Sequence, residues 1–141
     1  MEHPLVFEYI YNAPVSNLWL AITDKDEMRK WYFDLPEFKP QVGFEFQFWG
    51  GTESCKYLHH CKITEVDNEK RITYSWRYDG YNGISYVTFE LFPEGNQTRL
   101  ILTHSGIESF PEAIADFKSQ NFVEGWTAIL GTSLKENLEK D

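Results

Sequence analysis

The feature that most constrains this chain is an apolar stripe near its C-terminus. Large apolar residues recur there at every fourth position, namely Phe122, Trp126, Leu130, Leu134 and Leu138. Residues four apart lie on the same face of a helix, so the spacing predicts one amphipathic helix over 122–138. We expect Trp126 to pack on a neighbouring layer and Gly125 to let the helix backbone approach it closely. The rest of the chain must supply the surface that covers this face.

The residues before the stripe predict mostly strands. Alternating apolar and polar residues indicate strands over 5–11, 44–49, 57–66, 72–77, 84–92 and 99–104. Two short helices are predicted after the first strand, over 15–22 and 24–31, the second with Asp24 as its N-cap. The turns between later strands are short, so neighbouring strands are expected to pair antiparallel. The sequence therefore predicts an α+β fold in which twist curls the sheet toward the long helix.

Length and composition limit the function. A chain of 141 residues fits a single domain, 1–141, and its aromatic content of 17% provides a large core. The net charge of −9, with no more than two basic residues in a row, argues against a nucleic-acid partner. Without a basic, apolar leader or a stretch of about 20 apolar residues, we expect a cytoplasmic protein that does not insert into a membrane. No feature indicates an oligomeric state.

The cysteines predict no disulfide. Cys55 and Cys61 lie six residues apart in what reads as one strand with its approach. Strand residues at that spacing are about 20 Å apart, which is beyond the reach of a disulfide. We therefore expect reduced thiols.

The inward-facing residues of the strands have two interpretations, an ordinary core or the wall of a pocket. Tyrosine and histidine tips among apolar side chains favour a pocket, because ligand sites combine apolar walls with a few polar groups. A core histidine bonded within the protein is the simpler interpretation of His104, and contact with a ligand is the alternative. The candidate binding residues are Trp31, Phe44, Phe46, Phe48, Tyr57, His59, Tyr74, Trp76, Val87, Phe89, Leu102, His104, Trp126 and Leu130. Trp31, which precedes a proline-containing loop, is expected at the mouth.

The sequence assigns no catalytic residue, metal or cofactor. In a strand His59 and Cys61 share one face and His60 points away, so at most two ligands converge locally. A structural zinc site needs four ligands. Cys61 and His59 are also too far apart, at about 7 Å, to act as nucleophile and base.

Several motifs, taken in order, resemble the activator of heat-shock protein 90 ATPase homologue family. They are Ala13-Pro14-Val15 with Leu18-Trp19, Trp31-Tyr32, Gly43 with its alternating phenylalanines, Ile63-Thr64-Glu65-Val66, Ile72-Thr73-Tyr74-Ser75-Trp76, Gln97-Thr98-Arg99-Leu100 with His104, and Gly125-Trp126. The resemblance covers nearly the whole chain. It implies the START-like, birch-allergen-like helix-grip fold, a curved six-stranded antiparallel sheet wrapped around a long C-terminal helix. The co-chaperones of this family have two domains, and we expect one here.

Three functions follow from the resemblance and the residues. Members of the superfamily bind lipids, flavonoids, hormones or polyketides, and a few catalyse cyclisation or hydrolysis. The first hypothesis is binding of an apolar or aromatic small molecule without chemistry. The second is a protein-interaction module, such as a chaperone partner, which would use Trp49, Tyr86 and Phe92 on the outer face of the sheet. The third is a cyclase-type or hydrolase-type enzyme.

Overall fold

A computed structural model describes residues 4–32, 35, 37–51, 56–111, 114 and 117–139. The elements are β1 (Leu5–Tyr11), α1 (Val15–Thr23), α2 (Lys25–Trp31), β2 (Glu45–Gly51), β3 (Lys56–Asp67), β4 (Arg71–Tyr78), β5 (Ser85–Glu94), β6 (Gln97–Ser105), a 3₁₀ turn η1 (Ile107–Ser109), α3 (Ser119–Ala128), a π-helix η3 (Ile129–Leu134) and α4 (Lys135–Glu139). The predicted order of elements is confirmed. Cys55 lies outside the described residues.

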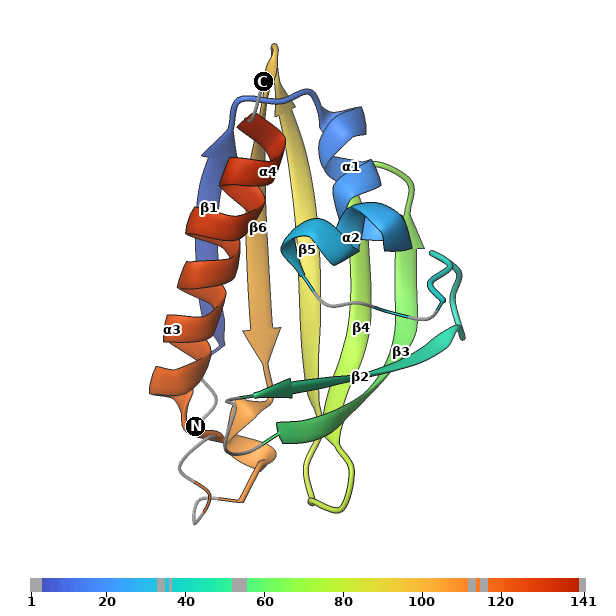
Figure 1. The fold of residues 1–141 in the computed structure, drawn as a ribbon, viewed down its shortest axis with the longest axis vertical. Coiled ribbons are helices and arrows are strands. Elements are labelled where there is room, and N and C mark those ends of the chain that lie inside the picture. The colour runs from blue at the N-terminus through green and yellow to red at the C-terminus, as the bar shows by residue number, and fades with distance from the viewer. Residues whose placement is uncertain are drawn as a thin grey trace.

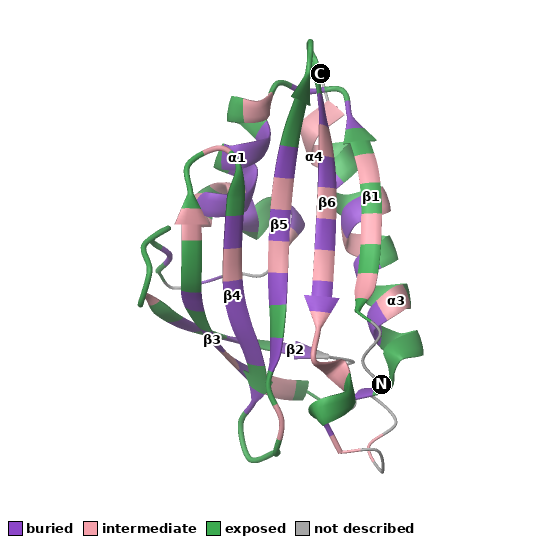
Figure 2. Cartoon of the chain, turned by 180° about the vertical axis from the view of Figure 1, so that it is seen from behind, coloured by how far each residue is buried: buried purple, intermediate pink, exposed green. Residues whose placement is uncertain are grey.

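The six strands form one antiparallel sheet in the order β1-β6-β5-β4-β3-β2. The sheet curves around the terminal helix, which runs along β1 and β6, while α1 and α2 cover the same face over β4 and β5 (Figure 1). Seen from behind, buried residues alternate with intermediate or exposed ones along β5 and with intermediate ones along most of β6 (Figure 2). The core therefore lies on the concave side, as the period of two requires. This is the predicted α+β helix-grip arrangement.

The short helices begin as their sequences dictate. The side chain of Asp24 accepts a hydrogen bond from the backbone N–H of Glu27 at 3.2 Å and caps α2. Acidic Asp26 and Glu27 lie in the first turn, and basic Arg29 and Lys30 lie in the last, which complements the helix dipole. This helix ends at Trp31 and so delivers the following residue, Tyr32, to the interior.

The terminal helix is continuous but not uniformly α-helical. Its middle, η3, is a π-helix, between α3 and α4. The hydroxyl of Tyr11, in β1, donates a buried hydrogen bond of 2.8 Å to the carbonyl oxygen of Leu130 within η3. A Cβ on Gly131 would stand 3.3 Å from the Tyr9 ring, so the sheet and helix approach closely here. The expectation that Gly125 makes the close approach was wrong, because a Cβ there would meet nothing within 4 Å.

We predict that the Tyr11 hydroxyl stabilises the junction of β1 and η3. Tyr11→Phe leaves a buried carbonyl without this donor and should lower the free energy of unfolding by about 1 to 2 kcal/mol. Urea unfolding followed by circular dichroism measures the loss. Tyr86→Phe removes an exposed hydroxyl from the outer face and is the matched control, expected to change stability by less than about 0.5 kcal/mol. Equal losses in both variants would contradict the assignment.

Candidate functional site

Aromatic rings fill the space between the concave face of the sheet and the terminal helix. We call Phe46, Phe48, His59, Tyr74, Trp76 and Trp126 the interior cluster. Edge-to-face or tilted contacts join its members, with centroid distances of 5.1 Å for Phe46 and Tyr74, 5.6 Å for Phe48 and Trp76, and 5.7 Å for Trp76 and Trp126. Such distances are favourable for aromatic pairs. The period-two alternation of β2, β3 and β4 thus gathers the cluster on one face.

Two residues from the end of α2 cover the interior cluster. Trp31 is buried, and its indole N–H donates to the carbonyl oxygen of Ala21 at 2.9 Å. It belongs to the core, which differs from the expected place at a mouth. Tyr32 stacks on Trp31 and also lies over Trp126, with centroids 4.9 Å and 6.2 Å away respectively. The half-buried Tyr32 ring, just after α2, therefore contacts the terminal helix through Trp126.

A pair of tyrosine hydroxyls lies within this aromatic surrounding. The hydroxyl oxygens of Tyr32 and Tyr74 are 2.7 Å apart, which is a short hydrogen bond. Burial is the main cause that raises the pKa of both phenols, so both remain protonated at any physiological pH. Two neutral hydroxyls can both donate and accept, which suits them to orient a polar group of a bound molecule.

His104 links the terminal helix to the sheet through a chain of hydrogen bonds. The indole N–H of Trp126 donates to Nδ1 of His104 at 3.0 Å, so Nδ1 must be the unprotonated nitrogen. Nε2 then carries the proton and donates to the Ser85 hydroxyl at 2.8 Å. That hydroxyl donates in turn to the carbonyl oxygen of Trp76 at 3.0 Å. Both imidazole nitrogens are occupied, so this geometry leaves His104 no lone pair with which to act as a base.

Burial keeps both interior histidines neutral. It lowers the pKa of His104 to about 3. It also lowers the pKa of His59 to about 4, although hydrogen bonds to the backbone of Tyr57 and Phe48 oppose this shift. The His59 ring stacks on Phe48 with a centroid distance of 4.4 Å, and its Nδ1 lies 3.0 Å from the carbonyl oxygen of Tyr57. Both rings therefore behave as flat, uncharged surfaces at neutral pH.

The other predicted site residues lie around the interior cluster and differ in how far they are buried. Val87, Phe89, Leu102 and Leu130 are fully buried in the same core. Phe44 and Tyr57 are half-buried at its margins. Cys61 is buried, and desolvation raises the pKa of its thiol, so it stays protonated. His60 points away from the interior, as expected, and lies 3.1 Å from the Asp79 carboxylate.

Three interior residues, Tyr78, Tyr32 and Ser85, were not among the site residues predicted from the sequence. Tyr78 continues the alternation of β4 by one step and stacks on Phe117 at 4.2 Å, so a longer reading of that pattern would have found it. Tyr32 follows the predicted α2 directly and could have been considered together with Trp31. Ser85 gave no signal, because only the pairing of Trp76 with Ser85 across β4 and β5 places it beside His104.

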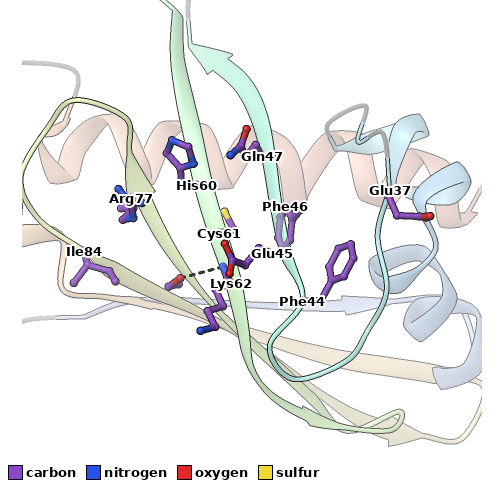
Figure 3. A pocket seen from close by; sticks show the side chains of 11 residues that line it. Glu37, Phe44, Glu45, Phe46, Gln47, His60, Cys61, Lys62, Arg77 and Ile84 are labelled. Atoms are coloured by element: carbon purple, nitrogen blue, oxygen red, sulfur yellow. Dashed lines mark hydrogen bonds between the residues drawn. The ribbon is translucent and has the colours of Figure 1, made fainter.

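A cavity of about 460 Å³ lies on the opposite, outer face of the sheet, over β2, β3 and β4 (Figure 3). It is lined by Glu37, Phe44, Glu45, Phe46, Gln47, His60, Cys61, Lys62, Ser75, Arg77 and Ile84. No pattern in the sequence indicates this cavity. Within the described ranges, no three His, Cys, Asp or Glu side chains group as metal ligands. No helix of this same part of the chain is both long and apolar enough to cross a membrane.

The curved sheet, the terminal helix against its concave face and the aromatic space between them define a helix-grip domain. Residues 12–139 match the family described as Activator of Hsp90 ATPase homolog 1-like protein, and the chain belongs to that family. A comparison with curated proteins finds no match.

Solved structures support the same fold. Mll3558 from Rhizobium loti is 22% identical, with 98% of each chain covered and a TM-score of 0.83. CalU16 from Micromonospora echinospora is 24% identical over 99% of this chain and 76% of its own, with a TM-score of 0.73. DynU16, a protein of the dynemicin biosynthetic locus, is 20% identical over 97% of this chain and 47% of its own, with a TM-score of 0.77. At these identities the likeness shows the fold alone.

The neutral interior histidines predict a pH dependence of stability. In the unfolded chain both are protonated below their ordinary pKa of 6.5, whereas the folded protein keeps them neutral down to about pH 4 for His59 and about pH 3 for His104. The unfolded state therefore binds more protons in that window. The contribution of these two histidines to the free energy of unfolding should be fully present above pH 6.5. Below pH 6.5 the free energy of unfolding should fall by about 1.4 kcal/mol per pH unit for each histidine.

Urea unfolding between pH 8 and pH 5 measures this slope. His104→Gln removes one of the two groups and should make the slope shallower, in addition to its general loss of stability. His59→Gln is the independent second variant. A slope that neither substitution reduces would show that other groups cause the acid sensitivity.

Proposed function

We propose that this protein binds an apolar or aromatic small molecule, lipid-like or polycyclic, between the sheet and the terminal helix. The observation that carries the proposal is the Tyr32 and Tyr74 hydroxyl pair within the interior cluster. Apolar walls with a few converging polar groups are the usual composition of a small-molecule site. Affinity would come from burial of the ligand surface against aromatic rings, and orientation from the two hydroxyls.

Tyr32 is the side chain that such a ligand would displace. Its ring already stacks on Trp126, with a centroid distance of 6.2 Å, as a planar ligand would, and it lies tilted against Phe48 at 6.1 Å. It is only half-buried, and it follows the last residue of α2, where the backbone leaves the helical conformation. Rotation of Tyr32 would expose Tyr74, Phe48 and Trp126 together.

The chemical state of the interior favours binding without a reaction. General acid or base catalysis works best with a group whose pKa lies near the working pH. The imidazole of His104 is neutral and bonded through both nitrogens, and the Cys61 thiol is held protonated by burial.

A thermal-shift screen with fatty acids, flavonoids and polycyclic aromatic compounds tests this proposal. A ligand at 100 times its Kd stabilises the folded state by about 2.7 kcal/mol, which raises the Tm by several degrees. Tyr74→Phe removes one neutral hydrogen bond and should weaken a hit by a few-fold to about tenfold. Tyr86→Phe, on the outer face, should leave the affinity unchanged. Absence of any stabilising compound, or equal loss in both variants, would refute the proposal.

A second candidate is a protein-interaction module that binds heat-shock protein 90. The family description and three large apolar side chains on the outer face favour it: Trp49 is 64% exposed, Phe92 43% and Tyr86 40%. They lie apart, on β2 and β5, so any contact would be anchored by single residues. Trp49 is the most exposed of the three and the best anchor, since tryptophan is enriched at the centres of interfaces.

Pull-down with purified heat-shock protein 90 tests this second candidate. If Trp49 is an anchor, Trp49→Ala should reduce capture by at least about tenfold, a loss typical of an anchor residue. Val42→Ala truncates another exposed apolar side chain, 66% exposed, and is the matched control. No capture of the wild-type chain would dismiss the candidate.

A further inference from the structure

The outer cavity lies over the part of β3 and β4 that includes His60, Lys62, Ser75 and Arg77. The pairing of these two strands runs to His60 opposite Arg77 and resumes at Ile63 opposite Tyr74. Between these steps the backbone N–H of Lys62 donates to the Ser75 hydroxyl at 3.0 Å instead of to a carbonyl oxygen. The Ser75 hydroxyl therefore adds a polar group to the floor of the cavity, close to the backbone of Lys62.

Two cations, Arg77 and Lys62, line this cavity and form no ion pair with a described residue. The four arginines of the chain are all within the described part, and Arg29, Arg71 and Arg99 form ion pairs with carboxylates. Arg77 forms none among the described residues, and neither does Lys62. In a chain of net charge −9, carboxylates are plentiful, so two cations without an ion pair at one cavity are available to contact a negatively charged group of a ligand.

Carboxylates also line the cavity, so its chemistry is amphoteric. Glu45 faces Lys62 across β2 and β3, and Figure 3 shows Arg77 and Glu37 at opposite ends of the opening. The Phe44 ring packs against Phe38 and Phe46 of the core, whereas Ile84, which is 40% exposed, gives the cavity an apolar wall on the Arg77 side (Figure 3). A simple anion would meet repulsion from the glutamates, whereas a ligand with both charges would not.

We propose that the outer cavity binds an α-amino acid or a similar small zwitterion. Arg77 and Lys62 hold the carboxylate, for which a guanidinium offers a bidentate contact. Glu45 receives the adjacent ammonium group. The side chain of the ligand extends along Ile84, which also lines the cavity. A volume of about 460 Å³ is within the range of small-molecule sites.

This site is separate from the interior ligand site. Phe46 and Cys61 line the outer cavity but are themselves buried, and the Phe46 ring packs against Tyr74 on the concave side. Neighbouring residues such as Glu45 and Phe46 point to opposite faces of β2. A fully charged zwitterion would also lose too much hydration to enter the apolar interior.

Calorimetric titration with three matched probes tests the inference. L-Phenylalanine carries both charges, 3-phenylpropionate lacks the ammonium group, and 2-phenylethylamine lacks the carboxylate. We expect L-phenylalanine to bind in a saturable manner and both analogues to bind more weakly. Equal or tighter binding of 2-phenylethylamine, or no saturation by L-phenylalanine at millimolar concentrations, overturns the proposal.

Substitutions of residues that line the outer cavity test where L-phenylalanine binds. Arg77→Met should weaken L-phenylalanine at least about tenfold, as expected for a lost charge-assisted bond. Lys118→Met removes one exposed positive charge at the start of α3 and should have no effect. Glu45→Gln should weaken L-phenylalanine but not 3-phenylpropionate. Binding that survives Arg77→Met unchanged in a protein with wild-type circular dichroism refutes the assignment.

The proposals for the two ligand sites can be refuted separately. Tyr74→Phe should leave the affinity for L-phenylalanine unchanged, because that hydroxyl lies on the concave side. A loss of L-phenylalanine binding in Tyr74→Phe would place the zwitterion in the interior and overturn the outer site. The response to neutral apolar compounds bears on the interior site alone.

Discussion

The structure depends on keeping a period-four apolar stripe on one face of the terminal helix. An α-helix has 3.6 residues per turn, so a stripe with a spacing of four would rotate steadily away from the sheet. A π-helix has more residues per turn, because its hydrogen bonds span five residues instead of four. The π-helix η3 between α3 and α4 therefore offsets the rotation, and Phe122, Trp126, Leu130 and Leu134 are all buried. The sheet contacts this same segment through Tyr9 and Tyr11.

Once the helix is fixed at η3, the chain from Trp126 through His104 and Ser85 to Trp76 sets its position over β4, β5 and β6. Each polar atom in the chain is used, so burial of the imidazole costs little as long as it stays neutral. Protonation would turn Nδ1 from an acceptor into a donor that faces the Trp126 N–H. The junction of helix and sheet is therefore specific as well as apolar, and its specificity requires a neutral His104.

The sequence predicts the repeating parts of this fold well, because periodicity reports which face of an element is buried. The six strands, two short helices and the inward position of His104 follow from alternation and turn residues alone. The π-helix does not, since the same stripe fits a plain α-helix if drift is ignored. Gly125 and Gly131 are equally plausible contact points in the sequence, and only the packing of Tyr9 selects Gly131. Ser85 and the outer cavity depend on strand register, which no local pattern encodes.

The alternation that builds the interior also determines the chemistry of the outer surface. Along β2 and β3 the residues that alternate with the inward-facing side chains are Glu45, Gln47, His60 and Lys62, and all four line the outer cavity. The interior cluster and the outer cavity therefore share backbone but not the side chains that would contact a ligand. Because strand pairing holds the backbone on both sides of the opening, substitutions on one face can change its chemistry while the other keeps its shape. A single sheet can in this way carry an apolar site and a charged site back to back.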